Sequence, residues 1–76
     1  MKEKILEILQ EIRPDVDFLN ENKLIDDKIL DSFDIISIVG ELNETFDVMI
    51  DAEELEPYNF NTVDAMVELV EKLSEE

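Results

Sequence analysis

The chain contains no cysteine and no histidine, and these two absences remove whole classes of chemistry. Without cysteine it can form neither a disulfide framework nor a thiolate metal site, and without histidine the common zinc sites are excluded. The acidic residues Asp15, Asp17, Asp26 and Asp27 do not follow the ligand spacing and central glycine of an EF-hand loop. We therefore expect no metal site.

Glycine and proline are also scarce, with one and two residues respectively, while 45% of the 76 residues are hydrophobic. This composition favours one compact helical domain, residues 1–76, over a disordered acidic tail. No apolar run is long enough to span a bilayer, and the first residues, 1–4, lack the apolar region of a signal peptide. We expect a cytoplasmic monomer with no stable membrane insertion.

Positively charged residues are also scarce. The chain has 6 Lys and Arg and 22 Asp and Glu, which gives a net charge of -16. No Lys or Arg occurs between Lys28 and Lys72. Such a field repels nucleic acid and anionic membranes and attracts basic protein surfaces. The alternative is that the charge only maintains solubility, but a merely soluble surface usually mixes both signs. We expect protein partners with basic docking surfaces and no nucleic acid.

Apolar spacing in the first part of the chain predicts one helix followed by a long connection. The helix runs from about Lys2 to Ile12 and is ended by Pro14, which pushes the residue before it out of the α region. Its apolar stripe is Ile5, Ile8, Leu9 and Ile12. Residues 15–31 have no clean period but are apolar enough to pack on a core, with a short helical turn expected near 20–24.

A second helix is predicted from the pair Asp31 and Ser32 to about Phe46, and its two faces differ. The inward face carries Ile35, Ile38, Val39, Leu42 and Phe46. The opposite face carries Phe33, Ile36, Ser37, Gly40 and Glu44, flanked by Asp34 and Glu41. Apolar residues beside a glycine that costs roughly 0.5–1 kcal/mol in a helix suggest a contact surface. Alternatively, Phe33 and Ile36 tuck under the long connection.

The remaining residues predict a linker and two further helices. Residues 47–51 read as an extended linker with inward apolar residues, and residues 52–55 as a short third helix that Asp51 caps and Pro57 ends. The last helix starts near residues 61–62, and its inward residues are Val63, Met66, Val67, Val70 and Leu73. The predicted fold class is therefore all-α, with four helical pieces, a long first loop and a short third helix.

Ser32 is the one hydroxyl placed where a covalent function could depend on it, between two acids at the start of the second helix. A nucleophilic serine needs a base within hydrogen-bond reach, and the only nearby candidate, Lys28, lies on the wrong side of the helix start. We therefore expect no catalytic residues and no enzyme activity. In the alternative interpretation, Ser32 or Asp31 only caps the helix by accepting backbone N–H groups.

A wider pattern surrounds this serine. It consists of LDSFD at 30–34, ETFDVMI at 44–50, EEL at 53–55 and TVD at 62–64. In order and spacing these segments resemble the acyl carrier protein family over most of the chain. The resemblance implies a four-helix bundle in which a separate phosphopantetheinyl transferase attaches 4'-phosphopantetheine from coenzyme A to Ser32, with Asp31 helping it to recognise the site. The thiol of that arm would carry an acyl or aminoacyl group as a thioester.

The resemblance also implies a docking surface and a subtype. The docking surface, for enzymes that load or use the cargo, would consist of Phe33, Asp34, Ile36, Gly40, Glu41 and Glu44. Phe33 stands where many members have leucine, and Ile35 and Ser37 replace polar or acidic residues of fatty-acid carriers. Residues 58–60 are similar to the D-alanyl type, so an aminoacyl or specialised carrier is favoured over primary fatty-acid synthesis. The alternative function is a non-covalent acidic adaptor on a basic partner, for which the Ser32 hydroxyl is not needed.

Overall fold

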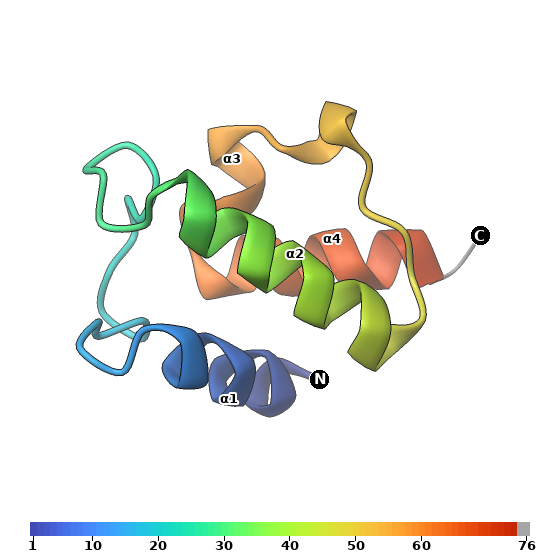
Figure 1. Ribbon diagram of the computed structural model, residues 1–76, viewed down its shortest axis with the longest axis horizontal. Coiled ribbons are helices and arrows are strands. Elements are labelled where there is room, and N and C mark those ends of the chain that lie inside the picture. The colour runs from blue at the N-terminus through green and yellow to red at the C-terminus, as the bar shows by residue number, and fades with distance from the viewer. Residues whose placement is uncertain (75–76) are drawn as a thin grey trace.

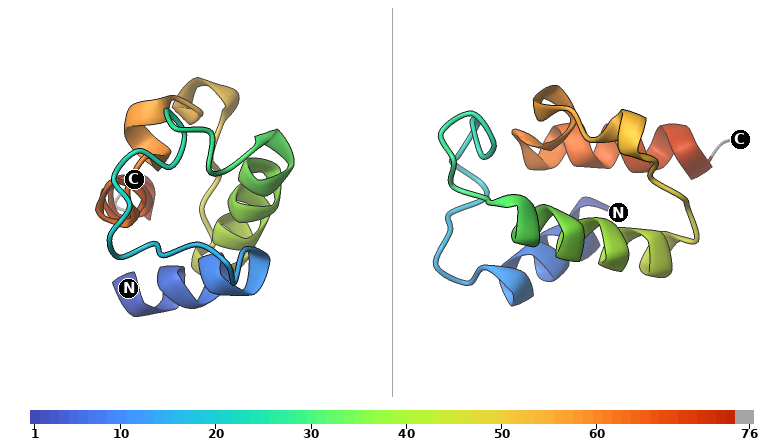
Figure 2. Two further views of the ribbon diagram at one scale, coloured as in Figure 1. Left: turned by 90° about the vertical axis from the view of Figure 1, so that its left-hand side faces the viewer. Right: turned by 45° about the horizontal axis from the view of Figure 1, so that its top comes forward.

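A computed structural model describes residues 1–74 as an all-α bundle (Figure 1). Its elements are α1 (Lys2–Ile12), α2 (Ser32–Phe46), a single 3-10 turn (Ala52–Glu54), α3 (Pro57–Phe60) and α4 (Val63–Ser74). Seen end-on, α1, α2 and α4 surround the core and α3 lies above them (Figure 2, left). The predicted four-helix class, with its long first loop and short third helix, is confirmed.

The first two predicted helices have the bounds that the sequence indicated. In α1, Ile5, Ile8 and Leu9 are buried. In α2, Ile38 and Leu42 are buried, while the other predicted inward residues, Ile35, Val39 and Phe46, are half-buried against the same core. The apolar period therefore placed the core face of both helices correctly.

The long connection between α1 and α2 contains turns and no helix near residues 20–24, so that part of the prediction is wrong. The N–H groups of Asn20 and Glu21 bond to the carbonyl of Asp17 in a single turn, and residues 24–26 bond to a distant segment. Asn61, at the end of α3, accepts the N–H groups of Ile25 and Asp26 with its side-chain oxygen and that of Leu24 with its carbonyl. The backbone N–H groups of residues 24–26 are therefore paired with the end of α3 and not within a helix.

The predicted packing of this connection onto the core is confirmed for most of its apolar residues. Phe18, Leu24 and Leu30 are buried, and Val16, Ile25 and Ile29 pack against the core more loosely. Leu19 differs, because its side chain is exposed. The loop is therefore fixed at both ends and in the middle, which fixes the approach of the chain to α2.

The segment after α2 departs from the prediction at Pro57. The expected helix at 52–55 is only a 3-10 turn without a side-chain cap from Asp51, and Pro57 begins α3 instead of ending the helix before it. Proline suits the first helical position, because the N–H that it lacks has no partner there in any case. In the preceding linker Ile50 is buried as predicted, whereas Met49 is exposed.

The last helix, α4, begins after Thr62, whose hydroxyl accepts the N–H of Ala65 at 3.0 Å as a helix cap. Its buried residues are Val63, Met66, Leu69 and Val70, and Val67 and Leu73 are half-buried. Leu69 was missing from the predicted set. Among residues 1–74, no helix has the length and apolar content that crossing a membrane would require.

Candidate functional site

Ser32 is the first residue of α2, where the long connection enters the helix (Figure 1). The residue before it, Asp31, accepts the N–H of Asp34 at 2.9 Å, and the Asp34 carboxylate accepts the N–H of Asp31 at 3.2 Å. This reciprocal capping box satisfies helix-start donors that would otherwise have no partner. Asp31, and not Ser32, is therefore the cap. Ser32 itself is exposed, and no side-chain hydrogen bond within residues 1–74 involves its hydroxyl.

Arg13, a residue that the sequence did not single out, holds this junction from outside α2. Its Nη1 donates to Asp34 Oδ2 at 2.6 Å and to the carbonyl oxygen of Ile29 at 3.1 Å. Its Nε and Nη2 both donate to the carboxylate of Asp15, each at 3.0 Å. One guanidinium therefore joins the end of α1, the long connection and the first turn of α2.

Two charged groups of this cluster, Arg13 and Asp15, have shifted pKa values. Hydrogen bonds to Asp15 and then to Asp34 raise the pKa of Arg13 above its ordinary value. The hydrogen bond from Arg13 lowers the pKa of Asp15 below its ordinary value. Each shift favours the charged form, so the pair is ionised at neutral pH.

The outward face of α2, defined here as Phe33, Ile36, Gly40, Glu41 and Glu44, is open to solvent. The side chains of Phe33 and Ile36 are 78% and 66% exposed, so the alternative that they tuck under the long connection is wrong. Asp34 differs from the other predicted docking residues. Its side chain is only 14% exposed and turns toward Arg13, which leaves it outside this open face.

Exposed apolar side chains also occur in the segment between α2 and α4, for which the sequence predicted no contact surface. They are Met49, Leu55 and Tyr58. Met49 and Ile50 are both apolar linker residues, but only Ile50 is buried. Its N–H is accepted by the Asn43 side chain at 2.9 Å, a contact that turns residue 50 toward the core. In an extended segment successive side chains point to opposite sides, so Met49 faces away from the core.

Replacing Gly40 by alanine is expected to raise the free energy of unfolding by about 0.5–1 kcal/mol. Gly40 lies inside α2 without a positive φ, and an added Cβ would meet nothing within 4 Å. Only the conformational entropy of the unfolded chain therefore changes appreciably. Urea unfolding measures the effect, with Ser37→Ala on the same helix as the control. A destabilised Gly40→Ala protein would mean that the space around residue 40 is occupied.

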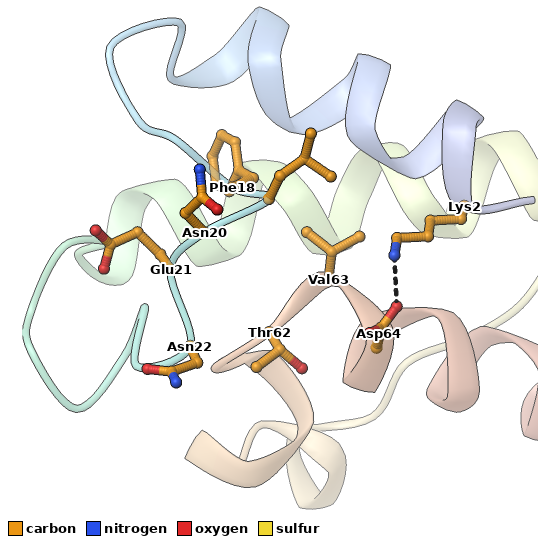
Figure 3. Close-up of a pocket in the computed structure, with 9 residues that line it drawn as sticks. Lys2, Phe18, Asn20, Glu21, Asn22, Thr62, Val63 and Asp64 are labelled. Carbon is orange, nitrogen blue, oxygen red and sulfur yellow. Dashed lines mark ion pairs between the residues drawn. The ribbon is translucent and has the colours of Figure 1, made fainter.

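A pocket of about 280 Å³ lies apart from Ser32, between the start of α1, the long connection and the start of α4 (Figure 3). The ion pair between Lys2 and Asp64, 2.9 Å long, lies beside it. The pocket is lined by Lys2, Phe18, Leu19, Asn20, Glu21, Asn22, Thr62, Val63 and Asp64. None of these belongs to α2, so this pocket forms no part of the site around Ser32.

Comparison with known proteins gives one match. A family model described as a phosphopantetheine attachment site matches residues 3–70, which include the junction around Ser32. No curated protein and no solved structure matches the chain. Covalent attachment of such a group requires a solvent-accessible nucleophilic atom, and the exposed, unbonded hydroxyl of Ser32 meets that requirement.

Proposed function

Because the chain belongs to the phosphopantetheine-binding family of carrier proteins, we propose that it carries an acyl or aminoacyl group on an arm attached to Ser32 and presents that group to partner enzymes. The observation that carries this proposal is the exposed Ser32 hydroxyl at the start of α2, inside the matched residues. When bound, the arm supplies a thiol, which the chain itself lacks, and the thiol can hold the cargo as a thioester.

The other serines support this choice of residue. Ser74 lies outside the matched segment, and its hydroxyl donates to the carbonyl of Val70 at 2.8 Å. Ser37 is exposed, but it lies within α2, where the helix backbone flanks it on both sides. Ser32 alone combines an accessible hydroxyl with a junction of loop and helix. A transferase can approach such a junction along the helix axis.

The transfer to Ser32 needs a separate phosphopantetheinyl transferase, because this chain offers no histidine as base. The Ser32 oxygen forms a bond to the phosphorus next to the pantetheine of coenzyme A, and the pyrophosphate bond breaks. The serine proton passes to the transferase, and the nucleoside bisphosphate leaves. Asp31 fixes the first turn of α2 beside the reacting hydroxyl, which agrees with the proposed role in recognition.

The position at the start of α2 also suits the charge of the product. A helix N-terminus carries a partial positive charge, which favours a phosphate group by typically 0.3–1 kcal/mol near the surface. Ser32 lies at this end of a 15-residue helix. The new phosphodiester would therefore lie in a favourable field, which the acidic carboxylates of Asp31 and Asp34 partly offset.

We propose that partners dock on the outward face of α2. Two exposed apolar side chains, Phe33 and Ile36, would supply the contact area, while Glu41 and Glu44 would attract a basic enzyme surface. The departures at residues 33, 35, 37 and 58–60 favour an aminoacyl or specialised cargo.

The test of the proposed function is intact mass after incubation of the apo protein with a broad-specificity phosphopantetheinyl transferase and coenzyme A. The protein should gain one phosphopantetheinyl group, and peptide mapping should place it on Ser32. Modification at another residue, or none with several such transferases, would contradict the carrier function. That result would favour the acidic adaptor instead.

Salt is expected to move stability and partner association in opposite directions. The net charge of -16 disfavours the compact state by self-repulsion, so added sodium chloride should raise the melting temperature. The same screening should slow association with the transferase, because the Debye length shortens to about 10 Å at 0.1 M salt. Stopped-flow association and thermal melts across one salt series measure both effects.

A pair of double variants makes this measurement specific to α2. Glu41→Gln with Glu44→Gln should weaken the salt dependence of the association rate. Glu68→Gln with Glu71→Gln removes the same charge from exposed positions on α4 and should change it less. Equal effects of the two pairs would mean that the total charge steers the partner and the outward face of α2 does not.

A further inference from the structure

We propose that Arg13 is a positioning residue for the modification of Ser32, acting through Asp34 and the carbonyl of Ile29. Arg13 is far from Ser32 in the sequence, and its hydrogen bonds cross from the end of α1 to the start of α2. The inference rests on the proposed function of Ser32, and it adds a residue that helps to set the geometry of that reaction.

The contacts of Arg13 bracket Ser32 on both sides. Ile29 precedes Ser32 by three residues and Asp34 follows it by two, and the same nitrogen, Nη1, donates to both. The bonded oxygen of Asp34, Oδ2, also accepts the N–H of Asp31. A single carboxylate oxygen therefore links Arg13 to the residue next to Ser32.

This cluster is partly shielded from water, which sets it apart from an ordinary surface ion pair. The side chains of Arg13 and Asp34 are 29% and 14% exposed, whereas Lys2 and Asp64 are 47% and 76% exposed in theirs. Shielding strengthens a charge-assisted hydrogen bond, while exposed pairs contribute little. The fork from Arg13 to Asp15 fixes the plane of the guanidinium, as arginine can and lysine cannot.

The position of Ser32 depends on such anchors because the chain before it has no regular structure. Residues 13–31 contain only turns and bends, and the first turn of a helix lacks half of its backbone bonds. A transferase must hold the Ser32 oxygen in line with the phosphorus, and small displacements lower the rate steeply. Loss of Arg13 should therefore lower kcat more than it raises KM.

The experiment compares four variants of the full chain as substrates of the transferase, with coenzyme A and intact mass as the readout. Arg13→Met removes the charge and should lower kcat on the order of tenfold, with little change in KM. Arg13→Lys keeps the charge without the fork and should show a smaller loss. Asp15→Asn weakens only the exposed side of the fork and should lose less than Arg13→Met. The control, Lys2→Met, breaks an exposed ion pair elsewhere and should stay close to wild type.

A double-mutant cycle separates positioning from a loss of stability. Each rate is measured at a temperature at which circular dichroism shows the variant folded. Arg13→Met and Asp34→Asn should each lower kcat, and the double variant should lose less than the product of the two factors, because both remove the same contact. Independent, multiplicative losses would contradict the proposal. If Arg13→Met does not fold, Arg13→Lys is judged by the same criterion.

The outcome is distinguishable from failure of the proposed function. A folded Arg13 variant modified with the wild-type kcat would overturn the role of Arg13, even though the wild type is modified on Ser32. A rise in KM alone would likewise overturn it, because it would make Arg13 a docking contact. Lack of modification of the wild type would overturn the proposed function itself.

Discussion

Replacing Leu42 by alanine is expected to lower the free energy of unfolding by about 2–5 kcal/mol, the range measured for buried leucines. Leu42 is fully buried in the middle of α2, in contact with the core shared by α1 and α4. The variant loses the transfer free energy of the deleted atoms and leaves a cavity that neighbouring helices can only partly fill. In a domain of this size such a loss is a large part of the total stability.

Phe33→Ala is the matched truncation on the opposite face of the same helix. Because the Phe33 side chain is 78% exposed, its removal should change stability far less than Leu42→Ala does. It should instead weaken docking, measured as a higher KM for the transferase. Urea unfolding of both variants decides the first point. If Phe33→Ala destabilised the fold as much as Leu42→Ala, Phe33 would belong to the core and the outward face would be misplaced.

The sequence predicted the two faces of α2 because the information is local. Apolar residues recur at helical spacing along one side, and the acidic residues Asp31 and Asp34 mark the start of the helix. The same applies to α1, whose last helical residue, Ile12, lies two residues before Pro14. Where the period and the cap agree within one segment, no other part of the chain has to be known.

The long connection could not be predicted in the same way, because its backbone partners are distant. Asn61 binds the N–H groups of Ile25 and Asp26 across 36 and 35 residues, and nothing within residues 15–31 indicates this. The prediction that Pro57 ends a helix was wrong for a different reason. Proline both ends a preceding helix and begins a following one, and the sequence offered no local feature that separated these two uses.

The candidate site likewise has some features that the local sequence predicts and others that depend on distant residues. The pattern around Ser32 and the resemblance that it carries were readable from the sequence, and the family match confirms the family. Arg13 could not be predicted from the sequence, because its proposed role depends on a hydrogen bond to Asp34 across 21 residues. For the same reason Asp34 was grouped with Phe33 on the docking surface, although its carboxylate turns the other way.

Replacing Ser32 by alanine is expected to abolish modification completely while leaving the fold intact. The proposed transfer forms a bond to the serine oxygen, so without that oxygen the reaction would have no nucleophile at this site. The fold should tolerate the change, because Ser32 is exposed and the capping bonds belong to Asp31 and Asp34. Surface substitutions of this kind usually change stability by no more than about 0.5 kcal/mol.

Ser37→Ala is the control, since it removes the other exposed serine hydroxyl of α2, five residues further along. That variant should gain one phosphopantetheinyl group as the wild type does, while Ser32→Ala gains none after prolonged incubation. Circular dichroism and urea unfolding establish that both are folded. A mass gain on Ser32→Ala would move the attachment to another residue, and the Asp31 cap and the Arg13 cluster would then not lie beside the modified residue.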